Sequence, residues 1–171
     1  MNRQSGSSLL PGGGQEVPNL DAGWETYQKI VQETVVSGSD IDDAYQELRC
    51  PMAPSEALEF ALLLLLFGAS ASDAALKVVV PGNAAGGGFT TYGIATSALF
   101  RTEQYGSDDF NTFVGTFRGG SGGVLDGWDF HRIEGSVLCG DDPGLLRFQL
   151  QGTGFIVKQG SLLRVRRAGV L

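Results

Sequence analysis

The single histidine of the chain, His131, is the first side chain to consider for catalysis. A catalytic histidine needs a nucleophile or an orienting carboxylate within hydrogen-bonding reach. Asp129 lies two positions earlier, so on a strand both side chains would point to the same face. This pairing alone does not define a site, and we favour a histidine at the surface or in an interface.

A second group with possible chemistry consists of Asp40, Asp42 and Asp43. Closely spaced carboxylates suggest calcium, but the segment lacks the central glycine and the distal glutamate of an EF-hand loop. A capped or solvated loop is the favoured interpretation. Ser39 or Asp40 could cap a short helical turn that reaches Leu48.

Cys50 and Cys139 are the only cysteines. Two distant cysteines make neither a metal site nor a disulfide framework, although a single bridge stays open. The chain starts with polar, glycine-rich sequence and shows no apolar signal core, which favours reduced, buried thiols. The glycine run at 86–88 lacks the Lys-Ser or Lys-Thr pair of a phosphate loop. We therefore predict no catalytic residue, no cofactor and no metal, and a protein that is not an enzyme.

Charge is distributed unevenly along the chain, which has a net charge of −7. All 19 acidic residues and 7 of the 12 basic residues precede Pro143, whereas residues 143–171 contain only basic charges. An acidic chain is not typical of nucleic-acid binding. The basic segment is either a strand paired inside an acidic domain or a basic edge that meets an acidic neighbour, such as another copy. In the second case the interface would contain Arg164, Arg166 and Arg167.

The stretch 56–81 carries two apolar arms around a small polar centre and organises the expected core. Leu- and Ala-rich residues 57–67 also suit a helix, but an apolar helix needs burial on all sides. Residues 76–80 are short and rich in valine, which favours a strand. We predict a long β-hairpin whose arms line one hydrophobic core. The apolar run is too short for a membrane span.

The remaining chain predicts an all-β, antiparallel β-sandwich or jelly roll. Its 26 glycines separate short segments with period-two alternation. Residues 1–22 form a predicted extended and flexible N-terminal arm, and residues 23–171 a single β-sandwich domain. In the arm, four apolar side chains could anchor on a neighbouring subunit: Leu9, Leu10, Val17 and Leu20. Strands are expected at 24–36, 110–117, 128–139, 144–151, 155–158 and 161–167, and the segments 89–95 and 96–102 are expected to form one or two further strands.

Two features together resemble a known class of protein. One is the strand pair LLFGASASDAALKVVV, and the other is a closing strand pair formed by GLLRFQL and QGSLLRVRR. They resemble small β-sandwich structural proteins of tailed-bacteriophage particles, of the capsid decoration, neck or fibre-attachment type. The resemblance covers mainly residues 58–80 and 144–167 and carries over no functional residue.

The resemblance implies a non-enzymatic virion subunit made in the host cytoplasm, without a signal peptide. It would assemble as a homo-oligomer through its arm and strand edges. Its partners would be copies of itself and other virion structural proteins, with no nucleic acid and no membrane. The alternative is a carbohydrate- or receptor-binding module. Trp24, Trp128 and the phenylalanines could stack on sugar rings, although core packing is the favoured role for most aromatic side chains.

Overall fold

The computed structural model of the chain describes residues 23–68, 74–94, 100–117, 128–151 and 155–170. The regular elements among these residues are antiparallel strands, apart from one short 3-10 helix, η1 (Ser107–Asp109). No helix in this part of the chain has the length and apolar character to cross a membrane. The predicted arm, 1–22, lies outside the described residues.

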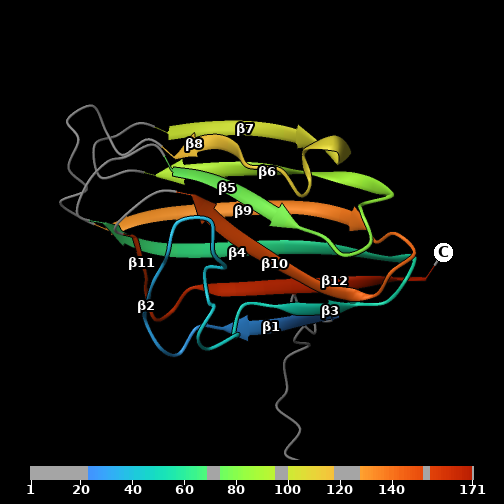
Figure 1. The fold of residues 1–171 in the computed structure, drawn as a ribbon, viewed down its shortest axis with the longest axis horizontal. Helices are drawn as coiled ribbons and strands as arrows, with labels where there is room; N and C mark the ends of the chain where they lie inside the picture. Colours follow the sequence, from blue (N-terminus) through green and yellow to red (C-terminus); the bar gives the residue numbers. More distant parts are fainter. Residues whose placement is uncertain (1–22, 69–73, 95–99, 118–127, 152–154, 171) are drawn as a thin grey trace, which may run out of the picture.

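Two sheets face each other in a sandwich (Figure 1). The larger sheet has the order β1-β12-β4-β9-β6-β7, with β2 and β11 joined at its side. Its strands are β1 (Trp24–Gln28), β2 (Glu33–Thr34), β4 (Glu56–Gly68), β6 (Gly86–Ile94), β7 (Phe100–Gly106), β9 (Trp128–Leu138), β11 (Phe155–Val157) and β12 (Leu162–Val170). The smaller sheet has the order β3-β10-β5-β8 and consists of β3 (Cys50–Met52), β5 (Ala74–Val79), β8 (Val114–Phe117) and β10 (Gly144–Gln151).

This strand order makes the protein a jelly roll. The four strands β1-β12-β4-β9 face the four strands β3-β10-β5-β8, and the chain crosses repeatedly from one sheet to the other. Two interlocked four-stranded sheets of this kind define the jelly-roll sandwich. The additional pair β6 and β7 extends the larger sheet beyond β9. The predicted all-β sandwich is therefore confirmed, and the jelly-roll order can be followed strand by strand.

The apolar stretch 56–68 is a strand and not a helix. Leu62, Leu64 and Leu66 are at most 1% exposed, whereas Leu63 and Leu65 between them are half-buried on the opposite face. This alternation is that of a strand, and it explains why the leucine run exceeds what one strand face needs.

The predicted hairpin, however, is wrong. β4 pairs with β12 and β9, while β5 pairs with β10 and β8 in the other sheet. The two arms line the same core from opposite sides, and they do so without pairing to each other.

The predicted closing pair is wrong for the same reason. β10 belongs to the smaller sheet, between β3 and β5, and β12 belongs to the larger one, between β1 and β4. The expected strand at 24–36 is interrupted, because only β1 and β2 are strands within it. Of the predicted helical turn between Ser39 or Asp40 and Leu48, only a single turn is present, in which the Gln46 amide donates to the Asp42 carbonyl at 2.7 Å. No helix follows from it, and Asp40 forms a bridge to β10.

The core lies between the sheets, where the inward side chains of both layers meet. Phe60 on β4 and Phe148 on β10 pack with ring centroids 5.8 Å apart, and both are at most 1% exposed. At the end near β6, Phe89 packs on Tyr105 and Phe110. Aromatic pairs at these distances add to the energy of apolar burial.

Candidate functional site

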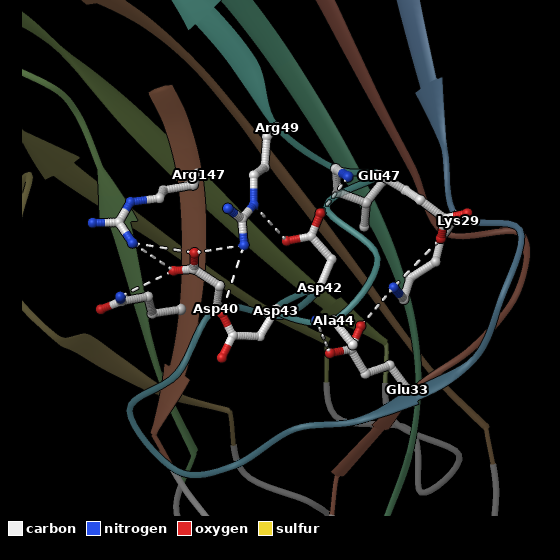
Figure 2. A network of polar contacts seen from close by, with 11 residues as sticks. Lys29, Glu33, Asp40, Asp42, Asp43, Ala44, Glu47, Arg49 and Arg147 are labelled. Carbon is white, nitrogen blue, oxygen red and sulfur yellow. Dashed lines mark hydrogen bonds and ion pairs between the residues drawn. The ribbon is translucent and has the colours of Figure 1, made fainter. Parts of the chain in front are cut away.

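A cluster of charged and polar side chains fixes the segment 29–49 to the sandwich (Figure 2). Asp40, only 4% exposed, accepts hydrogen bonds from Arg147 Nη1, which lies 3.1 Å from both carboxylate oxygens. Gln149 Nε2 donates to the same carboxylate at 3.0 Å, and Arg49 Nη2 lies at 3.0 Å. Because Arg147 and Gln149 belong to β10, the cluster joins this segment to the smaller sheet.

Two further buried charges complete the cluster. Asp42 is fully buried and accepts a hydrogen bond from the Leu48 backbone at 2.5 Å. Burial raises the pKa of Asp42. Lys29, also fully buried, lies 3.0 Å from Glu33 and 3.5 Å from Glu47, as Figure 2 shows.

The three aspartates therefore form part of a structural network. Asp40 and Asp42 are held by arginine and backbone donors, and Asp43 lies 3.6 Å from Arg49. The expectation of a capped or solvated loop was right for the exposed Asp43 and missed the burial of the other two. Within the described ranges, no group of three ligand-type side chains is placed to hold a metal ion.

His131 lies in the core and not at the surface, which corrects the sequence-based interpretation. Its side chain is 6% exposed and points inward from β9, beside Ile133 in the strand alternation. Desolvation lowers the pKa of His131 to about 4. The imidazole is therefore neutral at pH 7. A neutral core histidine on an inward-facing strand position fits a packing role.

Both cysteines are free thiols and buried, as predicted. Burial raises the pKa of Cys50 and of Cys139. The thiolate is the reactive form of cysteine, so neither side chain is activated as a nucleophile. Near Cys50, Arg167 Nη2 lies 3.5 Å from the sulfur.

The arginines singled out in the sequence lie on β12, which is paired on both sides by β1 and β4. Arg166 forms an ion pair with Glu59, and Arg167 forms ion pairs with Glu25 and Glu56. These contacts fit the first charge interpretation, a basic strand paired inside an acidic domain. A role for Arg164, Arg166 and Arg167 in an interface stays a prediction, and Leu9, Leu10, Val17 and Leu20 lie outside the described residues.

A shallow groove of about 610 Å³ crosses the larger sheet and is the candidate binding site. It is lined by Trp24 of β1, Glu59 and Ala61 of β4, Glu134 and Ser136 of β9, Thr90 of β6 and Gln104 of β7, among others. On β4 and β9 these positions alternate with the buried core residues, so their side chains lie on the outer face of the sheet.

Among the residues of this groove, sequence reasoning singled out Trp24 by name, and Phe60 and Phe89 only as members of the phenylalanine set. The polar positions of 56–68 and 128–138 alternate with core positions, and this signal could have placed Glu59 and Glu134 on an outer face. That these two side chains lie near each other depends on the register of β4 with β9, which brings together residues far apart in the chain.

The fold defines the protein as a jelly-roll β-sandwich, a class that includes viral capsid and lectin domains. No protein-family model matches this chain, and the comparison with curated proteins gives no match. Among solved structures there is a weak likeness to the structure of infectious bursal disease virus Gt strain, at 10% identity and a TM-score of 0.17. The match covers 86% of this chain and 38% of the viral one. So low a score does not establish a shared fold, and the assignment depends on the strand order.

Proposed function

We propose that this chain is a non-enzymatic structural subunit of a viral particle that assembles with copies of itself. The observation that carries the proposal is the jelly-roll strand order, which viral capsid domains use. The sequence resemblance narrows the proposal to a decoration, neck or fibre-attachment subunit of a tailed bacteriophage. Other virion structural proteins would then be further partners, and the virion its location.

Exposed apolar side chains on the segment 29–49 support assembly. Ile30 and Val36 are 66% and 69% exposed, and Tyr45 is 51% exposed. The buried ion network fixes this segment to β10, so the apolar side chains are presented by a segment that is fixed to the sheet. A contiguous patch of exposed apolar side chains is typical of protein–protein contact sites, and the proposal is that these three side chains contribute to one.

The position of the arginines indicates how assembly would depend on salt. Arg166 and Arg167 already pair with acidic residues of the same chain. They are therefore less available to attract an acidic neighbour. We expect apolar contacts to dominate and the oligomer to be insensitive to salt, since screening acts on exposed charges.

Light scattering of the full chain across a range of sodium chloride concentrations tests this proposal. We expect a discrete oligomer whose mass does not change with salt. A double variant, Ile30→Lys with Val36→Lys, should lower the mass, whereas Gln28→Lys, an exposed position on β1, is the control for added charge. A monomer at every salt concentration that also ignores phage particles in co-sedimentation would contradict the proposal.

A further inference from the structure

The groove on the outer face of the larger sheet has the size and extent of a ligand site. Its volume of about 610 Å³ falls within the range of roughly 300–1,000 Å³ found for small-molecule sites. It reaches from Trp24 on β1 to Gln104 on β7, across five strand spacings. At about 4.8 Å per spacing, this is a length of about 24 Å, which suits an elongated ligand.

Three of the residues that line the groove are small. Ala61, Gly88 and Ser136 occupy outward-facing positions where larger side chains would fill the space. At Gly88 a Cβ atom would lie 2.6 Å from the Tyr105 carbonyl oxygen, so β6 and β7 approach each other closely only because this position is glycine. This part of the hollow therefore depends on the glycine.

Strand register aligns the polar side chains of the groove in one row across the sheet. Ala61 pairs with Glu134, Glu134 with Thr90, and Thr90 with Gln104. Ser136 lies in the neighbouring row, opposite Glu59. Carboxylate, amide and hydroxyl groups supply both donors and acceptors of hydrogen bonds. Such a mixed row fits a ligand that carries many hydroxyl groups.

The charges of the groove are balanced by neighbours. Glu59 pairs with Arg166 on β12, and Glu134 pairs with Arg132 on its own strand. A carboxylate accepts several hydrogen bonds, so one arginine contact leaves it able to accept others. A ligand of net charge would upset this balance, and an anionic ligand would also face both carboxylates. The groove therefore suits an uncharged ligand.

Trp24 supplies an aromatic surface at one end of the groove. The guanidinium groups of Arg164 and Arg166 lie 5.1 and 5.3 Å from its ring centroid, and these cation–π contacts hold the ring in place. The side chain remains half-buried. An amphipathic ring beside polar groups combines an apolar contact with hydrogen bonding.

We infer that this groove binds a neutral oligosaccharide, with Trp24 against a sugar ring and Glu59, Glu134 and Gln104 on the hydroxyl groups. The inference goes beyond the role of a structural subunit and does not depend on it. A structural subunit and a separate binding module could both carry this site.

The test is a printed array of neutral, sialylated and sulfated glycans with the full-length protein, followed by calorimetric titration with the best neutral oligosaccharide. We expect neutral glycans to bind and anionic ones to be rejected. Trp24→Ala should weaken binding at least tenfold, and Trp24→Phe by less. Gln104→Ala, at the far end, should weaken it several-fold, because it removes an uncharged hydrogen bond.

A matched control separates the groove from general aromatic adhesion. Phe113 is 36% exposed, lies beside the smaller sheet and also contacts a cation, Lys77, at 5.1 Å. Phe113→Ala should leave glycan affinity unchanged. Thermal unfolding of each variant confirms that it is folded. Absence of neutral-glycan binding, preference for anionic glycans, or binding that folded Trp24→Ala and Gln104→Ala both retain would overturn the inference.

Discussion

Replacing Asp40 by asparagine should destabilise the protein markedly, because it removes one charge from a buried network. The carboxylate is 4% exposed and lies within 3.1 Å of Arg49, Arg147 and Gln149. Breaking a buried ion pair costs about 3–5 kcal/mol. Arg147 is 38% exposed and can be rehydrated, so we expect a loss of about 2–3 kcal/mol, which is at or below the lower limit of this range.

The loss should be visible as a lower midpoint of urea unfolding, followed by tryptophan fluorescence. For a chain of this length it corresponds to a fall in Tm of about 4–12 °C. Asp43→Asn is the matched control, because its side chain is 66% exposed and lies 3.6 Å from Arg49. An exposed pair of this kind contributes about 0–1 kcal/mol.

Hydrogen exchange would locate the effect. The Ile41 amide donates to the Phe148 carbonyl at 3.0 Å, and the Gly38 amide to the Leu150 carbonyl at 2.9 Å. Both amides should exchange faster in the Asp40→Asn variant, because the segment 29–49 loses its attachment to β10. Equal stability of the Asp40 and Asp43 variants, or unchanged exchange at Ile41, would refute the assignment of the network as the attachment of this segment.

Three further predictions concern the core. Phe60 is fully buried against Phe148, so Phe60→Ala should lower the free energy of unfolding by about 3–5 kcal/mol. Phe130 is 43% exposed on the same sheet, so Phe130→Ala should lower it by far less. Equal losses in urea titrations would contradict the packing described. In the unfolded chain His131 binds a proton below its ordinary pKa of 6.5, whereas the folded side chain does so only near 4. The stability that this side chain contributes is therefore present above pH 6.5 and is lost as the pH falls towards 4, by up to about 3 kcal/mol. His131→Gln should reduce the dependence of stability on pH in this range, and an unaltered dependence would argue against burial. Cys50 and Cys139, both buried with raised pKa values, should react with a thiol reagent only after unfolding, and rapid labelling of the native protein would contradict the structure.

The strands themselves could be predicted because their signal is local. Alternation of apolar and polar residues shows in a window of five residues, as in Leu146, Phe148 and Leu150, each fully buried. The valine-rich residues 76–80 were assigned correctly on the same ground. The leucine run 62–66 is harder to assign to strand or helix from sequence, because both of its faces are apolar. Only its burial in the structure shows that alternate leucines face the core.

Pairing was not available from the sequence, because it joins positions far apart in the chain. A short connection suggested that 57–67 and 76–80 were hydrogen-bonded neighbours, yet β4 and β5 lie in opposite sheets. Both arrangements bury the same side chains, so hydrophobic patterning cannot distinguish them. The inward direction of His131 could have been inferred from its alternation with Ile133 and Val137. Its nearly complete burial depends on the sheet that covers this face, which a local pattern does not contain.

The sequence by itself determined that this is an all-β protein with an apolar core, buried thiols and a basic C-terminal segment. The tertiary structure decided the jelly-roll order, the partners of Asp40 and Arg167, and the row of Glu134, Thr90 and Gln104 across three strands. The physical reason is that strand formation depends on neighbours along the chain. Charge pairing and the binding groove depend on which strands lie side by side.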